Sequence, residues 1–245
     1  MTNAGGRINA GPIHCVENHD GALTVWRDAG VSGRVLMHID AHHDMYGGWI
    51  DKKNPGERSR VNIANFVYAA LEEELVREVI WVVPDQTWAT PAGRRDIARE
   101  LKSLDQGAGR KKPAIQVEHD RIIGTVLGKR ILACTVENLR ALDEAVLLDI
   151  DVDYFVIPNV GYRGIKVYGS LPWCWPDELL LKLRARGIHT DLTTIAYSVE
   201  GDYTPLQWKY LGDELAQRLQ PESIDLTWTD RMRDAAQTSA RGDFG

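Results

Sequence analysis

Residues 145–155 read AVLLDIDVDYF, an apolar run that carries three aspartates on alternate positions, Asp149, Asp151 and Asp153. An apolar run of this length predicts a strand that is buried on both faces, as the strands of parallel sheets are. Ionisable side chains are costly at the end of a buried strand unless they have a use. The stretch therefore predicts both the class of fold and the place of a functional site.

Similar apolar runs recur along the chain, separated by segments whose apolar residues stand three or four positions apart, the spacing of a helix. Besides 145–155, the predicted strands are 12–17, 35–40, 79–85, 114–119, 131–137 and 193–201. The predicted helices are 18–30, 61–79, 90–104, 137–144, 176–187 and 205–219. Strands that alternate with helices predict a single α/β domain over residues 1–245, with a mostly parallel β-sheet sandwiched by helices. We expect its core at about 12–220, a surface loop at 105–113 and a polar tail at 221–245.

Composition narrows the class of protein. The 245 residues carry 29 Lys and Arg against 35 Asp and Glu, a net charge of -6, and 44% of them are hydrophobic. This composition excludes whole-chain disorder, and no apolar run approaches the roughly 18–20 residues of a membrane span. The mild acidity makes nucleic acid a poor candidate partner. Three scattered cysteines, Cys15, Cys134 and Cys174, and a start without an apolar signal region lead us to expect a cytoplasmic protein.

Polar residues follow four of the predicted strands where each strand ends. They are Glu17 to Asp20, Asp40 to Asp44, Asp149 to Asp153, and Glu200. Because ligands bind at the carboxyl ends of the strands in open α/β sheets, we expect these four groups to meet at one edge. In extended backbone, Asp40, His42 and Asp44 would share one face, as would the three aspartates of 145–155.

Five carboxylates that converge without a cation would repel one another, and some of them would have to be protonated. Divalent metal removes this repulsion, and a set of Asp and His without thiolate favours hard ions of the manganese type. Two close ions can lower the pKa of a shared water and supply hydroxide for attack on a carbon centre. Taken singly, the motifs allow other interpretations: a DxDxD loop can be solvated or bind one calcium, Asp20 can cap a helix, and Glu200 can be a surface residue.

The motifs also carry a family resemblance. HIDAHHDM (38–45) resembles the DAHxD motif of the arginase/agmatinase/deacetylase superfamily, and LLDIDVDYF (147–155) resembles its second Asp-x-Asp strand. In that superfamily a His before an early helix completes one metal shell, and His19 in VENHDGAL (16–23) matches it. The resemblance covers roughly Ile13 to Leu219.

The resemblance implies a pair of Mn²⁺ ions. When the arginase strand is aligned with residues 144–153, the apolar positions match best if Asp151 and Asp153 are the ligands. Asp149 would then support the ligands from behind. The alternative pair of ligands is Asp149 with Asp151. Glu200 matches the late-strand Glu that arginases aim at the substrate guanidinium. The implied metal ligands are His19, Asp40, His42, Asp44, Asp151 and Asp153.

The departures from ordinary arginases point to a narrower group. The GGDHS signature is absent, the Asp-Pro after the second Asp pair is replaced by Asp153-Tyr154-Phe155, and no His follows in residues 45–60. The pattern is instead similar to the peptide arginases of ribosomally made peptide pathways. Those enzymes convert arginine side chains in a precursor peptide to ornithine and release urea.

The predicted mechanism is attack of a metal-bridging hydroxide on the guanidino carbon. Glu200 would pair with the guanidinium, and Asp44 would relay the proton to the leaving amine, with His43 or His14 as a substitute. Tyr46, Trp49 and Tyr154 are candidates to line a groove for an extended peptide, against the alternative that they pack in the core.

Three other functions stay open: a ureohydrolase acting on a free small guanidine (arginase or agmatinase type), a deacetylase-like amide hydrolase, and a metal-dependent module that binds a peptide without cleaving it. Against the deacetylase, that branch has an Asp-x-His zinc pair where this chain has His42-x-Asp44. The expected partner is an arginine-containing precursor peptide. The sequence leaves the oligomeric state open, with a homo-oligomer among the alternatives, and does not separate manganese from iron or cobalt.

Overall fold

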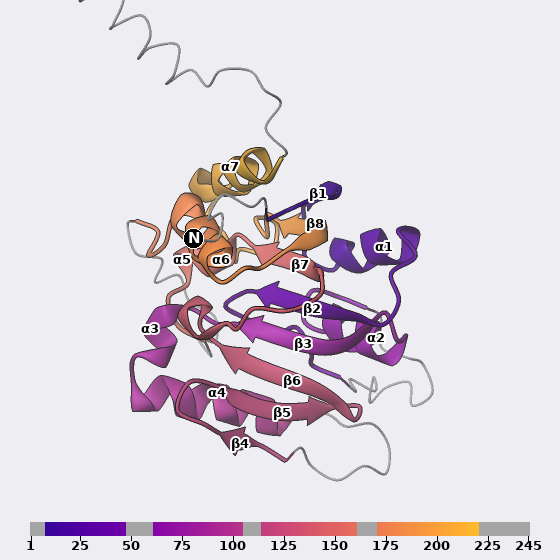
Figure 1. The fold of residues 1–245 in the computed structure, drawn as a ribbon. Coiled ribbons are helices and arrows are strands. Elements are labelled where there is room, and N and C mark those ends of the chain that lie inside the picture. The colour runs from indigo at the N-terminus through magenta and orange to yellow at the C-terminus, as the bar shows by residue number, and fades with distance from the viewer. Residues whose placement is uncertain (1–7, 48–60, 105–113, 161–170, 221–245) are drawn as a thin grey trace, which may run out of the picture.

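One eight-stranded sheet organises the molecule, in the order β1-β8-β7-β2-β3-β6-β5-β4. The computed structural model describes residues 8–47, 61–104, 114–160 and 171–220. Figure 1 shows the strands side by side, from β1 at the top to β4 at the bottom. All neighbours are parallel except β5, which runs antiparallel to β4 and β6. The α/β class with a mostly parallel sheet is therefore confirmed.

The eight strands are short, and the parallel strands other than the edge strand β1 are mostly buried. The strands are β1 (Ile13–Val16), β2 (Arg34–Ile39), β3 (Val76–Val82), β4 (Gln116–Val117), β5 (Ile122–Val126), β6 (Lys129–Cys134), β7 (Val146–Asp151) and β8 (Thr190–Ala196). In β7 every residue is buried, which fits a central strand with helices over both faces.

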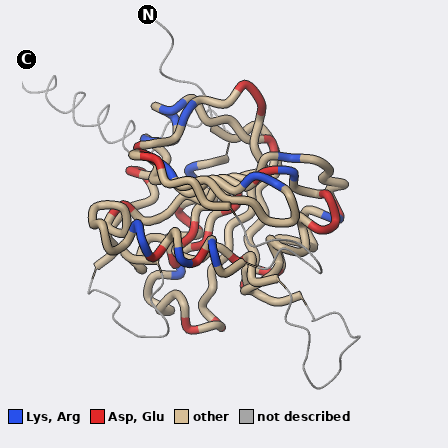
Figure 2. The backbone as a smooth tube through the Cα atoms, turned by 90° about the horizontal axis from the view of Figure 1, so that it is seen from below, with Lys and Arg blue, Asp and Glu red and all other residues tan. Residues whose placement is uncertain are grey.

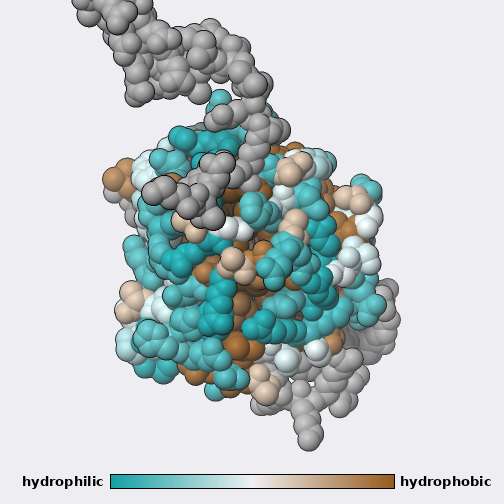
Figure 3. Space-filling model, viewed as in Figure 1, coloured by the Kyte–Doolittle hydropathy of each residue, from teal (hydrophilic) through white to brown (hydrophobic). Residues whose placement is uncertain are grey.

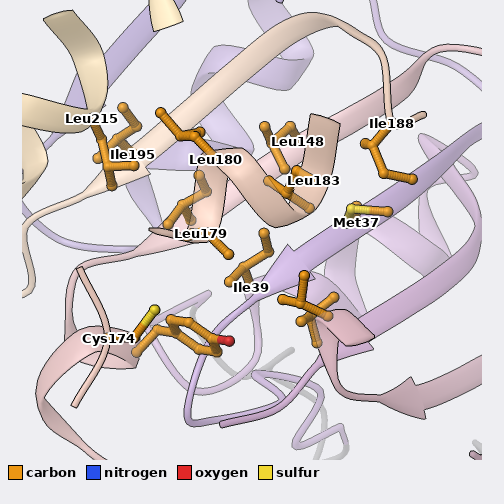
Figure 4. Close-up of a cluster of buried hydrophobic side chains, with 14 of the residues drawn as sticks. Met37, Ile39, Leu148, Cys174, Leu179, Leu180, Leu183, Ile188, Ile195 and Leu215 are labelled. Atoms are coloured by element: carbon orange, nitrogen blue, oxygen red, sulfur yellow. The ribbon is translucent and has the colours of Figure 1, made fainter. Parts of the chain in front are cut away.

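Helices cover both faces of the sheet. They are α1 (Gly21–Asp28), α2 (Phe66–Glu72), α3 (Asp85–Trp88), α4 (Pro91–Ser103), α5 (Asp153–Val156), α6 (Pro176–Ala185) and α7 (Tyr210–Leu219), with 3-10 turns η1 (Val136–Asn138) and η2 (Leu206–Trp208). Side chains of α1, α2 and α4 fill one hydrophobic cluster, and side chains of α6 and α7 fill the other. Figure 4 shows Leu179, Leu180 and Leu183 of α6 in one buried cluster with Met37 and Ile39 of β2.

Local sequence signals set several of these boundaries. Thr90 caps α4: its side chain accepts a hydrogen bond from the N–H of Gly93, and Pro91 occupies the first helical position. After α6, Gly187 adopts a φ of 67°, the left-handed conformation that ends many helices. These predicted ends are confirmed.

Other predictions were wrong in extent. The helix expected at 61–79 is only α2, because Glu74 turns the chain at a φ of 61° and the apolar residues from Val76 onward pair in β3. The helix expected at 137–144 is reduced to the short turn η1, and strand β5 was not predicted. Packing against buried neighbours in the sheet determines whether such segments form strands, and the propensity of the residues alone does not. The predicted loop at 105–113 and tail at 221–245 lie outside the described residues.

The surface is of the ordinary mixed kind. Figure 2 shows Lys and Arg interspersed with Asp and Glu along the chain, and Figure 3 shows mostly hydrophilic residues on the visible face with hydrophobic ones between them. The cysteines are free thiols, with Cys15 exposed and Cys134 and Cys174 buried. Within the parts of the chain that the structure covers, no helix is both long and apolar enough to cross a membrane.

Candidate metal centre

The polar residues predicted to meet at the carboxyl edge of the sheet do meet there. His19 lies in the turn between β1 and α1, and Asp40 follows directly after β2. Asp151 is the last residue of β7, and Asp153 is the first residue of α5. Since β2, β7, β8 and β1 are neighbours in one parallel sheet, their ends bring these residues together from distant parts of the chain.

His19 is the centre of the first group of donor atoms. Its Nδ1 lies 3.1 Å from Oδ2 of Asp40, 3.2 Å from Oδ2 of Asp44 and 3.0 Å from Oδ2 of Asp151. Ser198, whose φ of 54° turns the chain after β8, donates a hydrogen bond of 2.6 Å to that same oxygen of Asp151. One imidazole nitrogen and three carboxylate oxygens thus face a common point.

His42 forms a second group with Asp40 and Asp153. Its Nδ1 lies 2.8 Å from Oδ2 of Asp153 and 3.5 Å from Oδ1 of Asp40. Asp40 therefore directs Oδ2 toward His19 and Oδ1 toward His42. A single carboxylate connects the two groups.

Asp149 lies beneath this cluster, and its oxygens are already engaged. Oδ2 lies 2.8 Å from Nε2 of His19 and 2.8 Å from Nδ1 of His38, while Oδ1 accepts a 2.5 Å hydrogen bond from the hydroxyl of Thr194. All four side chains are buried. This placement is the one expected if Asp149 supports the ligands from behind.

His38 belongs to the cluster, and the sequence reasoning missed it. It pairs with Asp149 across β2 and β7, and its Nε2 lies 3.2 Å from Oδ2 of Asp40. The signal was available, because two residues before Asp40 in a strand is a position on the same face.

The expectation of an extended backbone through both motifs was wrong. Asp44 adopts a φ of 50°, and Val152 and Asp153 turn into helix α5. Asp151 stabilises that turn, because its Oδ1 accepts a hydrogen bond from the N–H of Asp153. The aspartates therefore converge because the chain turns back on itself at the sheet edge, and not because they alternate along a strand.

Burial and mutual proximity shift the pKa values in opposite directions within the cluster. Burial and the adjacent carboxylates raise the pKa of Asp44 and, more strongly, that of Asp153. For Asp40 burial acts against ionisation, but the neighbouring histidines prevail and hold its pKa well below the usual range. His19 and His42 show the converse, since burial is outweighed by the carboxylates and their pKa values are raised. Protons held on His19, His42 and Asp153 therefore reduce the repulsion between the carboxylates, as a bound cation would.

The residues fit a divalent metal centre. Four buried side-chain atoms at the cluster have no hydrogen-bond partner among the residues that the structure describes: Nδ1 of His19, Nε2 of His38, Oδ2 of Asp40 and Oδ2 of Asp153. Buried polar groups are normally satisfied, so these atoms call for a ligand. In the described ranges, two sets of side chains have the spacing of metal ligands, one with His19, His38 and Asp40, the other with Asp40, His42 and Asp153.

Glu200 lies exposed beside the cluster, in the turn after β8. One of its oxygens accepts a 2.9 Å hydrogen bond from Asn18, the residue before His19. Tyr203 in the same segment packs edge-on against the His42 ring at 5.2 Å and is 37% exposed. Tyr203 thus lies against a side chain, His42, that is itself partly open to solvent, while Glu200 is held next to His19 through Asn18.

The residues named as substitutes for a proton carrier lie elsewhere. His43 accepts a hydrogen bond at Nδ1 from the N–H of Met45, and its Nε2 points toward Glu100 at 3.6 Å. His14 is exposed in edge strand β1.

Of the aromatic residues proposed for a groove, Tyr154 is instead buried in the core against Phe155 and Trp173. Tyr46 is 36% exposed and donates a hydrogen bond to Glu100. Trp49 lies outside the described residues. Tyr154 is therefore excluded as a residue of the proposed groove, whereas Tyr46 remains a candidate.

Comparisons with known proteins give weak likenesses. No protein-family model and no curated protein matches this chain. Among solved structures, a hypothetical agmatinase from Burkholderia thailandensis is 15% identical with a TM-score of 0.43, covering 93% of this chain and 61% of that one. An arginase from Medicago truncatula is 17% identical with a TM-score of 0.39, covering 85% and 59%. The chain thus spans about three fifths of the length of either protein.

Proposed function

We propose that this protein is a hydrolase with two divalent metal ions that acts on a guanidino group, converting arginine side chains of a peptide to ornithine and releasing urea. The observation that carries the proposal is Asp40, which offers one oxygen to the group around His19 and the other to the group around His42. A carboxylate shared in this way is what two adjacent ions require. The resemblance of the motifs to the arginase superfamily supports the choice of reaction.

The proposed ligands divide into two sets that share Asp40. His19, Asp44 and Asp151 would hold one ion, and His42 and Asp153 the other. A donor set of carboxylate and imidazole without thiolate suits Mn²⁺. When bound, such a pair of ions supplies hydroxide at neutral pH.

Two residues of the chain would act on the substrate and its protons. Glu200 would bind the guanidinium through the fork geometry that a carboxylate offers. Water adds its oxygen to the guanidino carbon, the bond from that carbon to the side-chain nitrogen breaks, and the departing amine needs one proton. Asp44 would carry that proton from the attacking water to the amine.

A peptide substrate is supported by exposed aromatic residues at the same edge of the sheet. Trp175 immediately precedes α6 and packs against Trp208, which packs in turn against Tyr210 at the start of α7. Trp175 and Tyr210 are 40% and 45% exposed, and Leu206 is 73% exposed. These side chains offer apolar surface to the residues that flank an arginine.

The test is mass spectrometry of an arginine-containing peptide incubated with Mn²⁺-loaded protein, with a parallel urea assay on free arginine. We expect ornithine in the peptide and little urea from free arginine. Urea from free arginine alone would favour a small-molecule ureohydrolase. Bound metal without turnover of any guanidine would overturn the proposal, and hydrolysis of an acyl-lysine peptide would favour an amide hydrolase.

A further inference from the structure

His38 is the residue of the cluster that the arginase pattern leaves without a role. It is fully buried in β2, and its imidazole stacks on that of His19 with ring centroids 5.2 Å apart. Its Nδ1 lies 2.8 Å from Oδ2 of Asp149, the oxygen that also lies 2.8 Å from Nε2 of His19. One carboxylate oxygen therefore orients two imidazoles.

The contacts with Asp149 determine where the other nitrogen of each imidazole ring points. If each imidazole donates its N–H to Asp149, then Nδ1 of His19 and Nε2 of His38 are both free to act as ligands. Both face Oδ2 of Asp40, at 3.1 and 3.2 Å, and within the described part of the chain neither has a hydrogen-bond partner.

The spacing of these atoms fits one metal ion. Ligand bonds of roughly 2.1 Å at right angles separate adjacent ligand atoms by about 3.0 Å and opposite ones by about 4.2 Å. Nε2 of His38 lies 3.2 Å from Oδ2 of Asp40 and 4.0 Å from Oδ2 of Asp44. These two distances match an adjacent and an opposite pair of ligands.

We propose that Nε2 of His38 is a third imidazole ligand of the metal centre, bound to the ion next to His19 and aligned by Asp149. This inference rests on the proposed metal centre and adds a ligand to it. The ion next to His19 would then have two nitrogen ligands, and the ion next to His42 one. The two positions would differ in affinity for metals that prefer nitrogen.

The direct test is the crystal structure of the wild-type protein loaded with Mn²⁺, with the ions located by anomalous scattering. We expect one ion at about 2.2 Å from Nε2 of His38. If both ions are present and His38 lies beyond about 3 Å from each, the inference is wrong while the proposed function stands. If no Mn²⁺ binds at the cluster, both are wrong.

Metal affinity in solution provides a second readout. We expect His38→Gln to weaken Mn²⁺ binding at one of the two positions by more than the roughly 10–100-fold that loss of a supporting residue costs. Asp149→Asn should weaken it within that range. His119→Gln, at an exposed histidine outside the cluster, is the matched control and should leave both affinities unchanged. Unchanged binding in folded His38→Gln would overturn the inference.

Discussion

The proposed pair of metal ions depends on the two carboxylate oxygens of one residue, Asp40. Its side chain is fully buried, and its two oxygens face different histidines. A buried carboxylate held between His19 and His42 makes sense as a bridge between two cations, because alone it would cost more than it contributes.

Asp151 provides the sharpest test of the ligand set. Replacing Asp151 with Ala removes an oxygen that lies 3.0 Å from Nδ1 of His19, so we expect loss of turnover and of bound Mn²⁺. Metal content after gel filtration and ornithine formation measure the two effects. Asp143→Ala, at an exposed aspartate, is the control. Activity of Asp151→Ala at low Mn²⁺ would contradict the assignment.

Glu200 should separate substrate binding from metal binding. It is exposed and bonded to Asn18, and no ligand atom of the described cluster depends on it. Glu200→Gln keeps the shape but removes the charge that would pair with the guanidinium. We expect metal content to stay at the wild-type level and kcat/KM to fall by roughly 10- to 100-fold. Loss of metal in this variant would show that Glu200 has a different role.

At the scale of elements, β2 and β7 carry most of the cluster, and α6 covers them from one side. Leu179, Leu180 and Leu183 face the strands, whereas Leu181 points to solvent and is 66% exposed. The helix therefore holds the two strands in place through a narrow apolar stripe.

A pair of leucine substitutions in α6 tests this packing. Leu183→Ala deletes a fully buried side chain and should lower the free energy of unfolding by about 2–5 kcal/mol. Leu181→Ala in the same helix should change it by less than about 0.5 kcal/mol. Urea denaturation followed by circular dichroism measures both. Equal effects of the two substitutions would mean that α6 does not pack as described.

At the scale of the whole molecule, the metal-free protein carries a buried set of charges that protons must balance. Burial opposes a charge on His38, but the hydrogen bond with Asp149 and the nearby carboxylate of Asp40 prevail and raise its pKa to about 10, against an ordinary value of 6.5. The folded protein therefore holds a proton that the unfolded chain releases. The stability that this proton contributes is complete below pH 6.5 and is lost as the pH rises to 10.

The metal-free protein should consequently become less stable between pH 6.5 and 9. The raised pKa values of His19 and His42 act in the same direction, while the lowered values of Asp40 and Asp149 add nothing in this range. Urea midpoints measured with chelator present check this expectation. A midpoint that is flat or rises with pH would contradict it, and His38→Gln should reduce the slope.

Mn²⁺ should reverse this loss. Because ions displace the protons on the histidines, metal binding should strengthen as the pH rises, and the increase in Tm on adding Mn²⁺ should be larger at pH 8.5 than at pH 6.5. Removal of the metal with chelator should return the Tm to its metal-free value. An increase that is independent of pH would mean that the ion binds without displacing protons.

The sequence by itself determined the fold class and the meeting of the four strand ends. Apolar runs such as 145–155 identify buried parallel strands, and parallel strands place their carboxyl ends at one edge whatever the details of the loops. The metal ligands expected there all lie in the cluster: His19, Asp40, His42, Asp44, Asp151 and Asp153. The periodicity of apolar residues is a local property of the chain, so the sequence alone reveals it.

Only the tertiary structure decided the arrangement within the cluster. It placed Asp149 beneath His19, brought in His38, and turned the backbone at Asp44 and Asp153 where the sequence predicted extended chain. Tertiary packing likewise divided 61–79 between α2 and β3. The physical reason is that the direction of a side chain at a strand end depends on φ values and on neighbouring strands, and these are fixed by contacts between residues more than a hundred positions apart.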